Sequence, residues 1–157
     1  MPLSATLNKV LHAAIAQVAR QRTPVFTFAL YFDHESSAVA VCVDTEENSA
    51  KVVADINQYN ATHFRAAVEG GDLKAAALWQ ANTGRNLSLG DFALVNIART
   101  DLPNIDQDGK LEMALVRALV NVQGEVLALA KAAESVLFVC SSASDEVGYV
   151  WSAVGVA

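Results

Sequence analysis

Strong functional signatures are missing from this chain of 157 residues. Only 18% of the residues are charged, and the 8 glycines and 3 prolines are too few for a collagen-like or linker-like chain. A hydrophobic content of 53% also excludes a disordered acidic chain, which would combine low hydrophobicity with high charge. The composition therefore predicts a single folded domain over residues 1–157, which is long enough to bury a core.

The chain also lacks a long apolar run. Its uncharged runs, such as residues 23–32 and 147–157, are all shorter than the ~18 residues that a membrane span requires. Lys9 and His12 interrupt the apolar residues near the N-terminus, whereas a secretory signal needs an unbroken stretch of ~7–15 apolar residues. We therefore expect a cytoplasmic protein with no membrane contact.

Basic residues and cysteines are scarce. The 11 Lys and Arg residues are outnumbered by 17 Asp and Glu residues, and the net charge of −6 has the wrong sign for gripping nucleic acid. Cys42 and Cys140 each lie in an apolar run with strand character. Such cysteines are typical of small buried hydrophobes, which predicts free thiols and leaves a disulfide as the alternative.

No catalytic or metal-binding motif is present. His12, His34 and His63 do not pair at helical spacing, and neither cysteine belongs to a CxxC motif, so a zinc site has no support. The nucleophile and phosphate-binding motifs GxSxG, SxxK, GxGxxG and the P-loop are also missing. The sequence predicts no cofactor, no metal and no catalytic residue of a recognisable type.

One segment partly resembles a calcium loop. Asn104, Asp106 and Asp108 alternate as oxygen ligands do, and Gly109 takes the sixth position. The twelfth position should carry a glutamate, and here it is Leu115. A polar loop before a helix explains the same residues, and the sequence leaves open whether the loop binds an ion.

The first half of the chain shows clear periodicity. Apolar residues recur every three or four positions over residues 4–22, which predicts a helix with Ser4 as its N-cap. Residues 26–32 and 39–43 alternate as strands do, around a polar turn, and predict a β-hairpin. Asp44 and Glu47 are spaced as an acidic capping box, so a helix is expected from Thr45 to about Tyr59.

The second half is less regular. Residues 61–80 have helical character that Gly70 and Gly71 interrupt, and Asp72 is a new N-cap. A buried strand at residues 92–98, a long helix over residues 111–133 and a hairpin at residues 136–141 and 147–154 follow. The pattern predicts an α+β fold, with about five strands in a mostly antiparallel sheet and helices packed on it.

Carboxylates gather at the ends of the two predicted hairpins, where they are either solubilising turn residues or an acidic surface for a basic partner. Trp79, Trp151, Tyr31 and Tyr59 are candidate interface anchors, with burial in the core as the alternative. The residues expected to contact a partner are Asp33, His34, Glu35, Asp44, Glu46, Glu47, Trp79, Asp145 and Glu146.

The segment FTFALYFDHESSAVAVCVDTEEN resembles the opening hairpin of an uncharacterised bacterial family, known only as a domain of unknown function. Residues 28–31, 33–37 and 45–47 carry the resemblance, with Asp44 where the family often has asparagine, and Trp79 fits loosely. The likeness covers about the first half of the chain. Some family members resemble immunity proteins, which bind and block one toxin, and the resemblance supplies no catalytic residue.

The expected function is that of a small acidic immunity protein, which neutralises a basic toxin encoded nearby by occluding its active site. An enzyme built from scattered residues is one alternative, with His34, Glu35, Asp44 and Glu46 as its candidate groups. A module that dimerises through residues 92–98 or 147–154 is another. A monomer and a homodimer both remain open.

Overall fold

The computed structural model describes residues 2–102 and 110–153, so the calcium-like segment lies outside the described residues. The helices are α1 (Leu3–Gln21), α2 (Glu46–Glu69), α3 (Leu73–Ala76) and α4 (Lys110–Leu127), with 3₁₀ turns η1 (Ala77–Trp79), η2 (Leu89–Asp91) and η3 (Ala133–Ser135). The strands are β1 (Thr27–Asp33), β2 (Ala38–Asp44), β3 (Leu94–Asp101), β4 (Leu137–Cys140) and β5 (Tyr149–Trp151).

The five strands form one sheet in the order β3-β2-β1-β4-β5. Neighbouring strands pair antiparallel except β1 and β4, which pair in parallel with Leu30 opposite Cys140. The predicted α+β fold with a mostly antiparallel sheet is therefore confirmed, including both hairpins. No helix among the described residues is long and apolar enough to cross a membrane.

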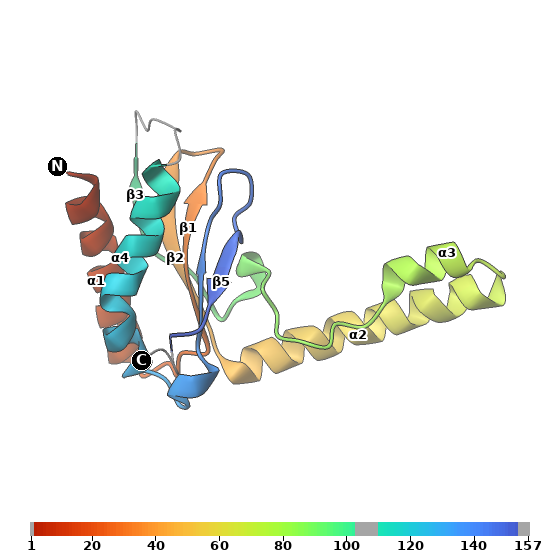
Figure 1. Cartoon of the computed structure of the whole chain (residues 1–157). Helices are drawn as coiled ribbons and strands as arrows, with labels where there is room; N and C mark the ends of the chain where they lie inside the picture. Colours follow the sequence, from red (N-terminus) through yellow and green to blue (C-terminus); the bar gives the residue numbers. More distant parts are fainter. Residues whose placement is uncertain (1, 103–109, 154–157) are drawn as a thin grey trace.

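Both long helices of the body, α1 and α4, cover the same face of the sheet (Figure 1). Alternate residues of each strand point to this face because strand side chains have a period of two. Phe28, Leu30 and Phe32 of β1 are almost fully buried there against Leu11 of α1 and Leu115 of α4. This contact forms the main core of the protein.

The opposite face of the sheet is covered by a loop instead of a helix. Ala29, Ala40 and Cys42 are fully buried there beneath Leu89 and Phe92, and the larger Tyr31 and Val139 complete this second cluster. The three small side chains let the loop lie close to the sheet.

Several predicted boundaries are corrected by the structure. Helix α1 has Pro2 as its N-cap, without a side-chain hydrogen bond, so Ser4 lies inside the first turn. Thr45, and not Asp44, caps α2 by accepting a hydrogen bond from the Asn48 N–H at 3.1 Å. Helix α4 ends at Leu127, and β3 is a half-exposed edge strand where a buried strand was expected.

A larger correction concerns α2. The sequence predicts a helix that ends near Tyr59, whereas α2 continues unbroken to Glu69. At about 1.5 Å per residue, its 24 residues extend for about 36 Å. Figure 1 shows that α2 leaves the body of the protein and that α3 packs on its far end. The chain thus consists of a two-layered body and a projecting arm.

The cysteines test the assignment of faces in the sheet. Cys42 and Cys140 are free, fully buried and on opposite faces, and burial raises the pKa of both thiols. We therefore expect Ellman's reagent to label neither thiol of the native protein and to label both in guanidinium chloride. Rapid labelling of either thiol at neutral pH without denaturant would contradict this packing.

Candidate protein-binding arm

The arm, defined here as residues 46–82, is nearly uncovered by the rest of the chain. Ser49, in its first turn, is the single buried residue of α2. Among the described residues, eleven large hydrophobic side chains are exposed, and six of them lie on the arm. They are Ile56 at 37%, Tyr59 at 59%, Phe64 at 41%, Val68 at 46%, Leu73 at 75% and Leu78 at 78% exposed.

The tip of the arm is a short helical hairpin. Gly70 ends α2, and Gly71 turns the chain with a φ of +75°, a conformation that glycine adopts without strain. The Asp72 carboxylate then caps α3 by accepting a hydrogen bond from the Ala75 N–H at 2.9 Å. The break and the cap were both predicted from the sequence, and they fold the chain back along α2.

Trp79 holds the returning chain against α2. Its indole stacks on the His63 ring at 4.4 Å between centroids and meets the Tyr59 ring edge-on at 5.9 Å. The Asn60 side-chain amide donates to the Gln80 carbonyl at 3.0 Å. Trp79 is therefore half-buried within the arm and presents its remaining surface to solvent.

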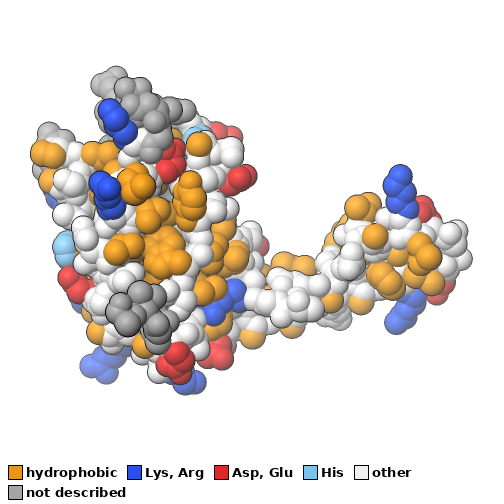
Figure 2. Space-filling view, viewed as in Figure 1, with side chains coloured by type: hydrophobic (Ala, Val, Ile, Leu, Met, Phe, Trp, Pro, Cys, Tyr) orange, Lys and Arg blue, Asp and Glu red, His pale blue; other side chains and the backbone are white. Residues whose placement is uncertain are grey.

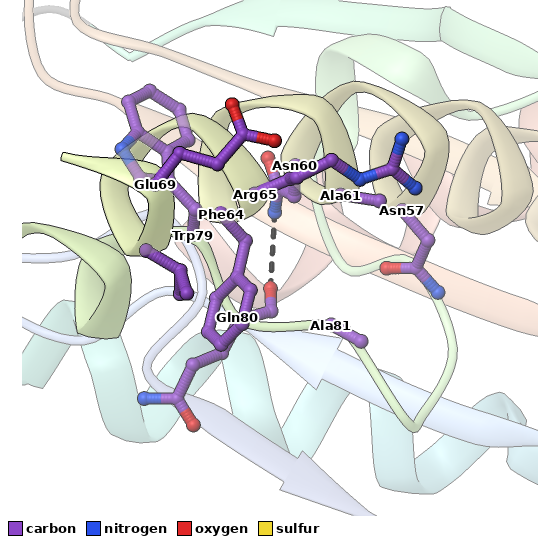
Figure 3. Close-up of a pocket in the computed structure, with 10 residues that line it drawn as sticks. Asn57, Asn60, Ala61, Phe64, Arg65, Glu69, Trp79, Gln80 and Ala81 are labelled. Carbon is purple, nitrogen blue, oxygen red and sulfur yellow. Dashed lines mark hydrogen bonds between the residues drawn. The ribbon is translucent and has the colours of Figure 1, made fainter. Parts of the chain in front are cut away.

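A shallow pocket of about 620 Å³ lies on one flank of the arm (Figure 3). Ala61, Phe64 and Val68 line its apolar part, and they follow one another along a single face of α2. Arg65 and Glu69 bring one charge of each sign to the same flank. Helical spacing thus produces an apolar stripe that the described chain covers only in part, with Phe64 and Val68 more than two-fifths exposed.

Asp44, which was expected on the partner-binding surface, is instead completely buried. Its Oδ1 atom accepts hydrogen bonds from the Asn48 side-chain amide at 2.8 Å and from the Ala93 N–H at 3.0 Å. The Asn48 amide also donates to the Asp91 carbonyl at 2.8 Å. Asp44 therefore fastens the root of the arm to the loop that returns from it, and the prediction of a surface role was wrong.

Arg85 secures the returning chain on the other side of the root. Its guanidinium donates to the carbonyls of Phe26 at 2.7 Å and Ser135 at 2.6 Å, and to Thr27 Oγ1 at 3.1 Å. It also lies 3.6 Å from the centroid of the Phe26 ring. Desolvation lowers the pKa of Arg85, and the nearby carboxyls of Asp44 and Glu46 oppose that shift.

The predicted surface residues are divided between the two ends of the sheet. Parallel pairing of β1 and β4 places the turn after β1 beside the loop after β4. The Phe32 N–H donates to Ser141 Oγ at 2.8 Å, and this hydroxyl donates to the Glu146 carbonyl at 2.9 Å. One acidic end of the sheet therefore contains Asp33, His34, Glu35, Asp145 and Glu146.

Asp33 also has a structural role at this end. Its carboxylate accepts hydrogen bonds from the Ser36 hydroxyl at 2.6 Å and from Arg99 at 3.3 Å. These bonds, that of Ser36 first, lower the pKa of the Asp33 carboxyl. The Asp33 carboxylate is thus partly neutralised by hydrogen bonds within the protein, which leaves less of its charge for a partner.

Glu46 and Glu47 lie at the opposite end of the sheet, at the root of the arm, and Trp79 lies on the arm itself. A strand of seven residues separates the two ends by about 20 Å. The alternative catalytic group of His34, Glu35, Asp44 and Glu46 therefore cannot converge on one substrate. Among the described residues, no group of His, Cys, Asp and Glu side chains is arranged to hold a metal.

Sequence reasoning named Tyr59 and Trp79 as candidate anchors but did not identify the exposed apolar surface around them. The residues it missed are Phe64, Arg65, Val68, Leu73 and Leu78. The sequence did contain one indication of this surface. Ala61, Phe64 and Val68 are spaced as on one face of a helix, and they lie beyond the expected end of the helix. That spacing predicts an apolar face but does not say whether the chain itself covers it.

Comparison with protein-family models, with curated proteins and with solved structures finds no match to this chain. The resemblance of the first hairpin to an uncharacterised bacterial family therefore stays a prediction.

The structural role of Asp44 can be separated from a surface role by substitution. Asp44→Ala leaves the Asn48 amide and the Ala93 N–H without an acceptor, so we expect a loss of about 2–3 kcal/mol in the free energy of unfolding. Asp44→Asn keeps the accepting oxygen and should cost less than about 1 kcal/mol. Urea denaturation gives both values.

Glu46→Ala is the matched control, because Glu46 is an exposed carboxylate at the same root and should change stability by less than about 0.5 kcal/mol. Equal effects of Asp44→Ala and Glu46→Ala would contradict the assigned role of Asp44.

Proposed function

We propose that this protein acts by binding another protein, with the arm as its main contact. The observation that carries the proposal is the row of large apolar side chains that the arm exposes, with Leu73 and Leu78 three-quarters or more accessible. Contiguous exposed apolar surface is unusual on a folded protein and is typical of interaction sites. Tyr59 and Trp79 add the aromatic surface that frequently dominates binding energy.

The particular function we propose is neutralisation of a toxin by occlusion. An arm about 36 Å long, at the ~1.5 Å rise per residue of a helix, is thin enough to enter an active-site cleft that a flat surface could not fill. The net charge of −6, with Glu46 and Glu47 at the root, favours encounter with a basic protein such as a nuclease. The acidic end of the sheet adds to the negative charge that attracts such a basic protein. The resemblance of the first hairpin to immunity-like proteins agrees with this function.

The test is co-expression with the product of the adjacent gene. We expect the two proteins to co-purify and the growth of cells that produce the toxin to be restored. Leu73→Asp/Leu78→Asp places two charges on the exposed tip and should weaken binding at least ~100-fold, about 3 kcal/mol, without unfolding the body. Leu73→Met/Leu78→Met keeps the tip apolar and serves as the matched control.

The proposal fails if the neighbouring gene product is no toxin, or if the two proteins do not bind at micromolar concentration. Equal binding by the Asp and Met variants would show that the tip of the arm does not contact the toxin, and the acidic end of the sheet would then be the binding surface.

A further inference from the structure

A second apolar surface lies on the body, between α4 and β5. It is a groove of about 670 Å³, and Figure 2 shows apolar side chains gathered over this part of the body. Its exposed members are Met113 at 54%, Val120 at 43% and Tyr149 at 47%. Trp151 forms the floor, where it stacks on Phe138 at 5.8 Å between centroids.

The groove exists because two helices are too few for the width of the sheet. Helix α1 packs mainly on β2 and β3, and α4 packs mainly on β1 and β4. Strand β5 reaches α4 through Trp151, whose indole N–H donates to the Gln123 side-chain oxygen at 3.4 Å, so β5 lies at the edge of the helical layer. A helix is about 10 Å wide and strands are about 4.8 Å apart, so each helix covers about two strands. The fifth strand is left with room beside α4 for one more helix.

The groove also contains an acidic group. Glu112 lines it, and its Oε2 atom is buried with no hydrogen-bond partner among the described residues. The described residues form no salt bridge to this carboxylate either. A helix that fills the groove should therefore bring a basic side chain next to apolar ones, since a buried carboxylate oxygen needs a partner.

We propose that the arm of a second copy of this chain occupies the groove. The arm supplies the matching chemistry, because Phe64 and Val68 flank Arg65 on one exposed stripe of α2. Arg65 is exposed and forms no salt bridge within the described chain. Docked in the groove, Arg65 pairs with the partner's Glu112 while Phe64 and Val68 cover the apolar floor.

A second copy docked arm to groove fits better than one docked groove to groove. Face-to-face pairing of two grooves would bring two Glu112 carboxylates together in an apolar interface, which is unfavourable. The arm cannot fill the groove of its own chain, because α2 is one continuous helix whose root is fastened to the sheet and whose tip points away from the body. When each copy places its arm in the groove of the other, both grooves are filled and the dimer has twofold symmetry.

This dimer rests on the proposed function in one respect, since it takes the arm to be a protein-binding element. It goes further by assigning a second site, the groove, and by naming its occupant. A toxin that takes the arm must then displace the second copy. Self-association therefore covers Phe64 and Val68 on the arm until the partner arrives.

The decisive experiment uses two charge-reversed chains, Arg65→Glu and Glu112→Lys, in analytical ultracentrifugation. Each chain alone brings like charges together at both contacts, so we expect its dimer dissociation constant to rise at least ~10-fold above that of the wild type.

Mixing the two reversed chains restores opposite charges at both contacts. At one contact the introduced glutamate on the arm faces the introduced lysine in the groove, and at the other the native Arg65 faces the native Glu112. The mixture should therefore form heterodimers within ~3-fold of the wild-type affinity, a difference of less than about one kcal/mol.

Tyr149→Asp in the groove and Val150→Asp next to it form a matched pair, since the two residues are 47% and 43% exposed and Val150, which pairs with Val139, points to the opposite face of the sheet. Tyr149→Asp should abolish the dimer and leave binding of the toxin intact, whereas Val150→Asp should change neither. A wild-type chain that stays monomeric at ~100 μM, well above the dissociation constants of specific dimers, would overturn the inference without touching the proposed function. A dimer that both reversed chains keep, or that mixing fails to restore, would overturn it as well.

Discussion

The buried carboxylate of Asp44 is the contact on which the shape of this protein depends. By accepting hydrogen bonds from Asn48 and Ala93, it joins the first turn of α2 to the loop that returns from the arm. Arg85 joins the same loop to Thr27 of β1 and to Ser135 of η3. With its root held on both sides, α2 leaves the sheet as a rigid extension instead of folding over it. The exposed apolar stripe is a direct consequence of that departure.

Local periodicity was enough to predict much of the body. The alternation in residues 26–32 and 39–43 identified the first hairpin, and the spacing of apolar residues identified α1 and α4, because these patterns reflect burial against one face. The chain reversal at Gly70 and Gly71 was equally readable, since glycine permits the turn and Asp72 caps the short helix α3. Free buried thiols at Cys42 and Cys140 also agree with the apolar runs in which they lie.

Features that depend on contacts between distant segments were not readable. Asp44 looked like a surface carboxylate because one of its two donors, the Ala93 N–H, reaches it only in the folded chain. The parallel pairing of β1 with β4 joins segments about a hundred residues apart, and it places the loop that carries Asp145 at the same end of the sheet as Asp33. The length of the arm was missed for a similar reason. An amphipathic helix predicts that something covers its apolar face, but the pattern does not distinguish the same chain from another molecule.

The arm is, in both proposals, an element that another protein molecule covers. Amide hydrogen exchange across residues 56–79 measures this directly, because exchange slows where a helix gains contacts. We predict fast exchange in the arm at high dilution, and slower exchange as the protein concentration rises or the partner is added, while β1 and β2 stay equally protected throughout. Arm amides as protected as those of the sheet in a dilute monomer, and unaffected by concentration or partner, would contradict this role of the arm.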